Sequence, residues 1–315
     1  MKYYLAPLEG ITGYIYRNAY HTYFEDFDKY FLPFLAPHEN RSFNAKEKND
    51  LLPEHNEGIC AVPQVLTNHA EAFLRIAGDL QAMGYSEVNL NLGCPSGTVV
   101  AKGRGSGFLR NPKELDDFFA QIFEKVSMKI SVKTRVGIDS AAEWEELLAV
   151  YNRYPLEELI VHPRIQKDFY KNAPRMECFR LAADVSENVL CYNGDLFTLE
   201  EYQSFREEYP KIDRTMYGRG VIRNPGLLGE IKSGTKVSAE VLKGFHDRLY
   251  HDYMELFSGD KNVLFKMKEI WSYMADSFAD SGKYAKKIRK AQRSADYEAA
   301  VNALFRDCEL HNWIP

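Results

Sequence analysis

Short apolar runs alternate with longer amphipathic stretches between residues 3 and 217 of the chain. Apolar residues recur at helical spacing in the stretch 69–83. Asn111 followed by Pro112 is a typical start for a second helix, which is expected to run to about Val126. The short runs have the length of strands. They predict strands at residues 3–6, 29–32, 61–66, 87–92, 129–135, 158–162, 188–192 and 214–217.

Eight strands with helices between them predict an α/β fold, a closed (β/α)8 TIM barrel whose strands are buried on both faces. The alternative is an open doubly wound sheet, which is disfavoured because no Gly-x-Gly-x-x-Gly turn follows the first strand. Residues 33–57 are polar and weakly patterned, and we expect a long loop there. The barrel is predicted to occupy residues 1–235.

The pattern changes after about residue 235, where helical spacing continues but strand-like runs do not recur. Ser238 is placed to cap the first helix of this part, and Ser294 is placed to cap the last. Further helices are expected at residues 262–278 and 283–293, and the last is expected to end near residue 310. Helices without strands predict a small C-terminal helical bundle domain, residues 236–315.

Composition narrows the class of protein. The chain has 315 residues, of which 45% are apolar, and its net charge of −5 excludes a globally basic nucleic-acid binder. Any contact with RNA must therefore come from a local basic patch. The five cysteines form no Cys-x-x-Cys pair and no zinc spacing, which is typical of a reducing compartment. No apolar run has the length of a membrane span or a signal peptide, so we expect a cytoplasmic protein without a metal and without membrane contact.

The most specific chemistry lies at the end of the fourth predicted strand. There Asn91-Leu92-Gly93-Cys94-Pro95 ends the apolar run, and a glycine-rich basic loop follows at residues 102–107. The carboxyl ends of barrel strands form the face on which barrel enzymes carry their active sites, so Cys94 is a candidate catalytic residue. A lone cysteine is about as often a small buried apolar residue, and its spacing alone does not distinguish the two.

This stretch resembles the signature of the tRNA-dihydrouridine synthase family. Similar matches follow in the family's order and spacing at residues 6–12, 132–135, 162–164, 193–195 and 218–220. Members of the family are flavoproteins that reduce a uridine of tRNA to 5,6-dihydrouridine. The resemblance therefore implies FMN as the cofactor, NADPH or NADH as the electron donor and tRNA as the substrate, with ribosomal RNA as the alternative RNA.

Residues at the ends of several predicted strands are candidates for binding FMN. The phosphate site of such barrels commonly lies in the loops after the seventh and eighth strands. The residues at these two places are Asn193, Gly194, Asp195, Gly218 and Arg219. Lys133 lies in an apolar strand, where its charge requires an anion, either the electron-rich side of a flavin or a structural carboxylate. The resemblance implies further flavin contacts from Ala6, Pro7, Leu8, Gln64 and His162.

The resemblance also implies that Cys94 is the proton donor when hydride from FMN reduces the uracil double bond. An unperturbed thiol has a pKa of about 8.5 and is protonated at neutral pH, as a general acid requires. Asn91 is expected to hydrogen-bond the polar edge of uracil, and Arg164 resembles a residue that holds the substrate. Tyr170 is expected to stack on an extruded base, with packing in the core as the alternative.

Residues 281–295 contain six basic residues and no acid. At helical spacing the basic residues fall on one face, and an apolar set falls on the other, namely Tyr284, Ile288, Ala291 and Ala295. In a chain of negative net charge such a face is typical of phosphate binding, with an ordinary solvated surface as the alternative. We expect binding of tRNA by Lys283, Lys286, Lys287 and Lys290, with Lys102 extending the basic surface.

Two other functions stay open at this point. One is an FMN-dependent reductase of a free pyrimidine or a small enone, and the other is a catalytically inactive RNA-binding protein on the same fold. The basic stretch argues against the first, and Cys94 together with the two glycine turns argues against the second. Because the sequence has no dinucleotide-binding fingerprint, the nicotinamide donor is expected to dock transiently at the flavin. We expect a monomer.

Overall fold

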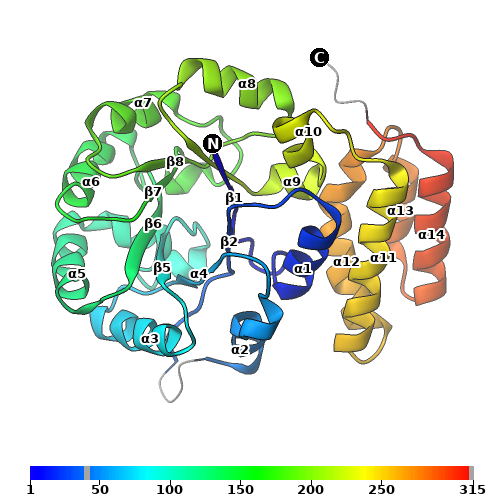
Figure 1. Cartoon of the computed structure of the whole chain (residues 1–315), viewed down its shortest axis with the longest axis horizontal. Coiled ribbons are helices and arrows are strands. Elements are labelled where there is room, and N and C mark those ends of the chain that lie inside the picture. Colours follow the sequence, from blue (N-terminus) through cyan, green and yellow to red (C-terminus); the bar gives the residue numbers. More distant parts are fainter. Residues whose placement is uncertain (39–42, 312–315) are drawn as a thin grey trace. The chain divides into compact units, whose positions relative to one another are not determined.

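The structure is a computed structural model that describes residues 1–38 and 43–311 (Figure 1). Contacts between residues divide the chain into two compact units, and each is described by itself. The first unit comprises Met1–Pro7, Asp28–Asp195 and Tyr209–Met216. The second unit comprises Leu8–Phe27, Leu196–Glu208 and the chain from Tyr217 onward. The two units interleave along the chain, and the predicted domain boundary at residue 235 stays a prediction.

The strands form one sheet that closes on itself. They are β1 (Lys2–Leu5), β2 (Lys29–Phe31), β3 (Ala61–Val62), β4 (Gln64–Val65), β5 (Glu87–Leu92), β6 (Lys129–Arg135), β7 (Leu159–His162), β8 (Leu190–Tyr192) and β9 (Arg214–Tyr217). Their order in the sheet is β3-β2-β1-β9-β8-β7-β6-β5-β4. Pro63 separates β3 from β4, because proline has no N–H group to continue the ladder. β3 pairs with β2 and β4 pairs with β5, so the two halves of this strand join the ends of the sheet.

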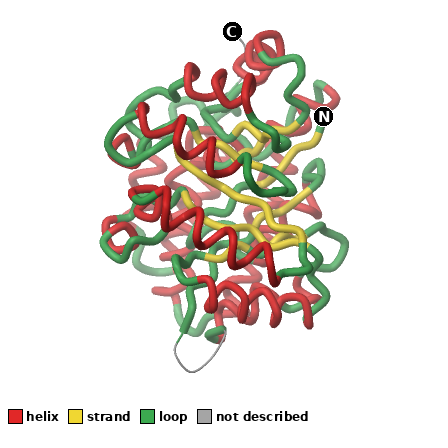
Figure 2. Tube along the Cα trace, turned by 90° about the vertical axis from the view of Figure 1, so that its left-hand side faces the viewer, coloured by secondary structure: helices red, strands yellow, loops and turns green. Residues whose placement is uncertain are grey.

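The predicted TIM barrel is confirmed, and every predicted strand is present. The paired strands run parallel, and Figure 2 shows them gathered in yellow with helices outside them. β5 and β6 carry polar residues at alternate positions. Asn91 pairs in register with Lys133, and Asn89 pairs with Ser131. Because successive residues of a strand point to opposite faces, these polar residues share the inner face of the barrel.

The helices of the first unit are α2 (Ala45–Leu51), α3 (Ala70–Ala82), α4 (Gly97–Val100), α5 (Pro112–Lys125), α6 (Trp144–Tyr151) and α7 (Met176–Val185). Most of them lie along the outside of its strands, whereas α4 follows the carboxyl end of β5. The side chain of Asn111 accepts a hydrogen bond from the N–H of Glu114 at 3.3 Å, which confirms the predicted N-cap of α5. In Figure 1, α5 lies between α3 and α6.

The long loop predicted for residues 33–57 is wrong in part. Residues Ala45–Leu51 form α2, and its start is fixed by a capping box in which Asn44 and Glu47 bond each other's backbone N–H groups. The short polar sequence of this helix gave no apolar periodicity from which to predict it. Residues 39–42 of the stretch lie outside the described residues.

The second unit is helical in its described part. Its helices are α1 (Tyr14–Tyr23), α8 (Leu199–Glu208), α9 (Arg219–Arg223), α10 (Leu227–Ser233), α11 (Ala239–Leu256), α12 (Asp260–Met274), α13 (Gly282–Lys290) and α14 (Ser294–Asp307). Ser238 caps α11 as predicted, because its hydroxyl accepts a bond from the Val241 N–H at 3.2 Å. The predicted cap by Ser294 is wrong: this residue starts α14, and its N–H donates to Asp260 at 2.7 Å. Within residues 1–38 and 43–311, no helix is both long and apolar enough to cross a membrane.

Candidate active site

Cys94 lies in a turn that is held on both sides, just after the carboxyl end of β5. The Asn91 side chain folds back on this turn, and its Oδ1 accepts hydrogen bonds from the N–H groups of Gly93 (3.0 Å) and Cys94 (2.9 Å). The carbonyl oxygen of Cys94 accepts bonds from the hydroxyl and the N–H of Ser106, at 2.8 and 3.1 Å. Cys94 itself is half-buried. These bonds therefore fix the backbone of the turn, while Cys94 stays partly exposed.

The glycine-rich loop is shaped to lie against this turn. Gly105 has a φ angle of 56°, in the left-handed region that favours glycine. A Cβ at this position would lie 2.9 Å from the carbonyl oxygen of Cys94 and 3.0 Å from its Cβ. Glycine at 105 therefore permits the close approach that lets Ser106 bond the Cys94 carbonyl.

Arg135 at the end of β6 ties the Cys94 turn to the segment after β7. Its side chain is almost fully buried and donates to three backbone carbonyls: Nε to Gly93 (2.9 Å), Nη1 to Ile165 (2.9 Å) and Nη2 to Phe169 (2.8 Å). Its guanidinium also lies 5.3 Å from the centre of the Tyr170 ring, a cation–π distance. One side chain thus sets the spacing between the thiol and this segment.

We expect Arg135→Lys to lower the free energy of unfolding by about 2–4 kcal/mol, because one ammonium cannot replace the fork of donors that satisfies three buried carbonyls. The rate of the catalysed reaction is expected to fall by about a hundredfold, since a shift of about 1 Å in a reacting group has that effect. Chemical denaturation and single-turnover kinetics measure the two changes. Arg153→Lys is the matched control, because Arg153 is exposed and makes one surface ion pair with Asp116. Equal losses in both variants would contradict the role assigned to Arg135.

Lys133 lies in β6 beside Asn91 and is half-buried. Burial, together with the neighbouring charge of Arg135, lowers the pKa of its ammonium to about 8. Among residues 1–38 and 43–311, no group forms a hydrogen bond or an ion pair with this ammonium, so the structural carboxylate considered above is not found there. A cation in this setting is stabilised by an anion. The site therefore fits a ligand with a negative or electron-rich edge.

His162 is buried at the end of β7 and is held in one tautomer. Burial lowers the pKa of its ring well below the ordinary value, and the charges of Arg135 and Lys133 act in the same direction, so the ring is neutral at pH 7. Nδ1 lies 2.5 Å from the carbonyl oxygen of Asn193 and so carries the proton that it donates there. Nε2 is left as the acceptor.

The buried Arg164 forms an ion pair with the half-buried Asp195 beside His162. The guanidinium donates to both carboxylate oxygens of Asp195, at 3.0 and 2.5 Å, and to the carbonyl of Asn172 at 2.6 Å. Asn193 in turn donates from its side chain to the carbonyl of Met216 at 2.9 Å. The loop after β8 is thus anchored to its neighbours, and the guanidinium predicted to hold substrate is engaged within the chain.

The other predicted cofactor residues are placed as follows. Gln64 is fully buried, and both halves of its amide are bonded, to Asn89 and to Asn91 at 2.7 Å each. Ala6 and Pro7 follow β1, and Gly194 lies so close to Tyr192 that a Cβ there would overlap the ring. Leu8, Gly218 and Arg219 belong to the second unit, where Arg219 lies 5.4 Å from the Phe197 ring. The flavin contacts of all these residues stay predictions.

Phe169 and Tyr170 form an exposed aromatic pair in the segment that Arg135 holds. The two side chains are 44% and 52% exposed, so Tyr170 is not packed in the core. The Tyr170 ring lies 6.0 Å from the His162 ring. Phe169 has a φ angle of 48°, a strained value for a residue with a side chain. Such strain is maintained only when surrounding contacts impose it, and here the bond from Arg135 to the Phe169 carbonyl is one of them.

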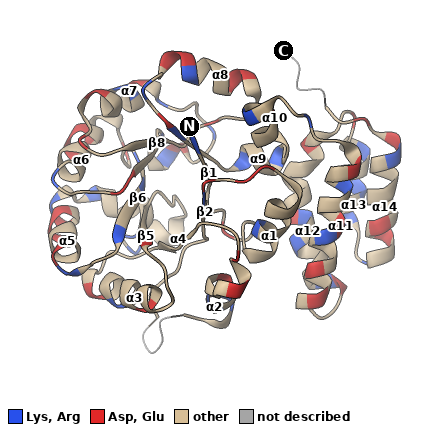
Figure 3. Ribbon diagram, in the orientation of Figure 1, with Lys and Arg blue, Asp and Glu red and all other residues tan. Residues whose placement is uncertain are grey.

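The predicted basic surface lies on α13 and just after it. Its six basic side chains are exposed, and in the described part of the chain none of them forms an ion pair with a carboxylate; they are Lys283, Lys286, Lys287, Arg289, Lys290 and Arg293. Figure 3 shows basic residues in blue along α13. Tyr284, Ile288 and Ala291 are buried as predicted, whereas Ala295 is exposed and belongs to α14. Lys102 is exposed in the first unit.

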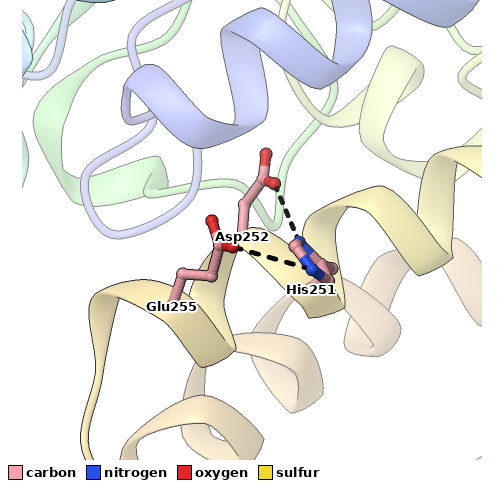
Figure 4. Close-up of side chains that lie close together, drawn as sticks. All are labelled: His251, Asp252 and Glu255. Carbon is pink, nitrogen blue, oxygen red and sulfur yellow. Dashed lines mark ion pairs between the residues drawn. The ribbon is translucent and has the colours of Figure 1, made fainter.

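One group of side chains in the described part of the chain has the composition of a metal site. His251, Asp252 and Glu255 lie close together on α11 (Figure 4). His251 and Glu255 are 68% and 69% exposed, and Asp252 accepts a hydrogen bond from Arg248 at 2.7 Å. These three side chains are therefore interpreted as ordinary solvent-exposed ion pairs on one face of α11.

Sequence reasoning missed Arg135, Ser106 and Gln166 as parts of the site. Each bonds a backbone carbonyl of the Cys94 turn: Arg135 that of Gly93, Ser106 that of Cys94, and Gln166 that of Pro95 at 3.1 Å. Carbonyls occur at every residue, so a sequence does not indicate which of them a side chain reaches. The one available signal was a second basic residue, two positions after Lys133 in the same buried strand.

The fold and the site together define a class, a (β/α)8-barrel protein with a fixed cysteine and a half-buried lysine at the carboxyl ends of adjacent strands. The chain belongs to the dihydrouridine synthase family, whose profile, described as Dihydrouridine synthase (Dus), matches residues 4–309.

Relatives agree with this assignment, and a solved structure shares the fold alone. A Staphylococcus aureus protein named "Probable tRNA-dihydrouridine synthase" is 28% identical over 243 residues, which are 70% of this chain and 68% of the relative. A Staphylococcus epidermidis protein of the same name is 26% identical over 276 residues, 83% of this chain and 80% of the relative. The old yellow enzyme from Trypanosoma cruzi has a similar fold, with a TM-score of 0.50 at 11% identity over 78% of this chain and 92% of that one.

Proposed function

We propose that the protein is a tRNA-dihydrouridine synthase that reduces a uridine of tRNA to 5,6-dihydrouridine, with FMN as the hydride donor and Cys94 as the proton donor. The observation that carries this proposal is the Cys94 turn, in which a half-buried thiol is fixed by Asn91, Ser106 and Arg135 beside the strand that carries Lys133. Membership of the family and the names of the relatives support it.

Reduction of the uracil double bond requires one hydride and one proton. Bound reduced FMN supplies a hydride to one carbon of the uracil double bond. The thiol of Cys94 gives its proton to the other carbon, and the thiolate that remains takes a proton from solvent, which its partial exposure permits. The role of the turn is to hold the sulfur at one distance from the base, because the geometry of a proton donor decides its efficiency.

The residues of the barrel edge fit a flavin. The ammonium of Lys133, which lacks a bonded partner among the described residues, is suited to the electron-rich side of the ring. The neutral His162 and the amide of Gln64 offer hydrogen-bonding groups to the same ligand. The proposal keeps Ala6, Pro7 and Leu8 as ring contacts through the backbone. It keeps Asn193, Gly194, Asp195, Gly218 and Arg219 as phosphate contacts.

The substrate side of the proposal assigns stacking to the exposed aromatic pair. Tyr170, with Phe169, presents a ring that a flipped base can stack on, because base–aromatic stacking tolerates any base. Arg164 keeps its predicted place at the substrate edge, where its pair with Asp195 holds it rigid. Oδ1 of Asn91 already accepts two backbone bonds, so the contact with uracil predicted for this residue is assigned to the second N–H of its amide, which is not used by the bond to Gln64.

Mass spectrometry of RNA from cells that lack the gene tests the proposal. Loss of dihydrouridine at one tRNA position is expected, and the purified protein with reduced FMN is expected to restore it to that tRNA. Unchanged dihydrouridine in all tRNA, together with a loss in ribosomal RNA, would move the substrate to ribosomal RNA. Rates of flavin reduction with NADPH and with NADH identify the electron donor.

The basic surface on α13 is proposed to bind the tRNA backbone. Lys286→Gln with Lys290→Gln is expected to weaken tRNA binding and to reduce the slope of log affinity against log salt by about 2, because each lost phosphate contact removes about 0.9. Filter binding over a range of salt concentrations measures this slope. Lys113→Gln with Lys125→Gln, two exposed lysines of α5 in the first unit, is the matched control and is expected to leave the slope unchanged. An equal effect of both pairs would contradict a specific surface.

A further inference from the structure

A line of hydrogen-bonded side chains crosses the interior of the barrel and ends at the Cys94 turn. It starts at Glu87, the first residue of β5, whose carboxylate accepts bonds from the Lys29 ammonium (2.6 Å) and the Ser131 hydroxyl (2.7 Å). The oxygen of Ser131 in turn accepts a bond from Nδ2 of Asn89 at 2.9 Å. Asn89 and Ser131 are fully buried, so water does not compete for these bonds.

The line continues through two more amides. Oδ1 of Asn89 accepts from Nε2 of Gln64 at 2.7 Å, and Oε1 of Gln64 accepts from Nδ2 of Asn91 at 2.7 Å. Oδ1 of Asn91 accepts from the N–H groups of Gly93 and Cys94. Each of the three amides therefore points its NH2 group toward Glu87 and its oxygen toward Cys94.

The groups at both ends of the line can be hydrogen-bonded only when the amides point in this direction. A carboxylate only accepts hydrogen bonds, so the single proton of Ser131 goes to Glu87 and its oxygen is left to accept from Asn89. At the other end the backbone N–H groups only donate, so Asn91 must face them with its oxygen. If the amides turned over, the NH2 group of Asn91 would face two N–H donors and the bonds to the turn would be lost.

We propose that Glu87, Ser131 and Asn89 are positioning residues for Cys94. They act through Gln64 and Asn91, by fixing the direction of the amides and thereby the bonds that hold the cysteine turn. This inference rests on the proposed function in one respect: the position of the turn matters for catalysis only if Cys94 is the proton donor. The direction of the hydrogen bonds along the line does not depend on the reaction.

The test cuts the line at its hydroxyl, far from the cysteine along the chain. Ser131→Ala removes the group that fixes the direction, and Ser131→Thr keeps it. Backbone hydrogen exchange resolved at Gly93 and Cys94 reports on the turn in the absence of substrate. Loss of a buried hydrogen bond to the turn is expected to speed exchange at these two residues by about tenfold in Ser131→Ala, and Ser131→Thr is expected to restore protection.

Two further variants make the result specific. Ser277→Ala is the matched control, because Ser277 is also buried and donates to a backbone carbonyl, that of Arg223 in the second unit. Glu87→Gln keeps the shape but can donate, so it permits the reversed direction and is expected to loosen the same two residues. Unchanged exchange at Gly93 and Cys94 in Ser131→Ala would overturn the proposal, as would an equal change there in Ser277→Ala.

Kinetics link the line to the reaction. In single turnovers with reduced enzyme, Ser131→Ala is expected to lower the rate of dihydrouridine formation by about tenfold with KM for tRNA unchanged, because the donor is displaced while the RNA-binding surface is intact. If the wild-type protein forms no dihydrouridine at all, the proposed function fails, and the exchange measurements still decide the inference on their own. A faster exchange without any loss of rate in an active enzyme would overturn the positioning role.

Discussion

Replacement of Cys94 with alanine is expected to lower the rate of dihydrouridine formation by about 10²–10⁴-fold, the contribution of a positioned general acid. The substitution removes the proton donor and leaves the backbone of the turn, so the bonds from Asn91 and Ser106 remain. Flavin content and tRNA affinity are therefore expected to stay at wild-type values. Single-turnover reduction of tRNA, followed by mass spectrometry of the digested RNA, measures the rate.

Two other cysteine variants test whether this loss of rate is specific to the thiol of Cys94. Cys60 is exposed and is not part of the Cys94 turn, so Cys60→Ser is expected to retain full activity. Cys94→Ser keeps a hydroxyl of similar size in the same turn, but a hydroxyl is a much weaker acid than a thiol, so its rate is expected to remain close to that of Cys94→Ala. A Cys94→Ala enzyme that reduces tRNA at the wild-type rate would contradict the assignment of the proton donor. Loss of bound flavin in this variant would assign Cys94 to cofactor binding instead.

Much of the barrel could be predicted from the sequence, because short runs of strand length recur between stretches with helical spacing. The bounds of β5, β6 and β9 were predicted correctly although these strands mix apolar and polar residues, and the N-caps Asn111 and Ser238 were found from local chemistry. The helix α2 was missed because it is short and polar, and its capping box is its main signal. Apolar periodicity predicts only those elements that bury an apolar face. The start of α2 is fixed instead by its capping box.

Individual residues of the candidate site could be predicted from the sequence, but the hydrogen bonds that join distant segments could not. Lys133 was identified because a charge in an apolar strand is unusual, and Cys94 because of its motif. The bonds of Asn91 to the next turn follow a local pattern that asparagine commonly forms with N–H groups two and three residues ahead, so the sequence did contain that signal. The bonds of Arg135 join loops that are distant in the sequence, and only the closed sheet brings them together.

Lys133→Met is expected to weaken FMN binding by about a hundredfold, the effect of removing one partner from a buried charge interaction. Methionine keeps an unbranched apolar stem of similar shape, so the variant is expected to fold. Because the ligand-free protein carries the charge of Lys133 without a bonded partner among the described residues, the variant is expected to be at least as stable as wild type below pH 8. Lys129→Met, at the exposed start of the same strand, is the matched control for affinity. Flavin fluorescence titration and chemical denaturation measure the two properties.

The pH dependence of the same site follows from the pKa of Lys133, about 8 in the folded protein against 10.5 for an unperturbed lysine. Between these values the unfolded chain binds more protons than the folded one, so the free energy of unfolding of the ligand-free protein is expected to rise with pH from about 8 to 10. Binding of an electron-rich ligand requires the charged form. FMN affinity is therefore expected to be constant below pH 8 and to fall above it by up to about tenfold per pH unit. Both trends are expected to vanish in Lys133→Met, and their persistence in that variant would show that another group titrates.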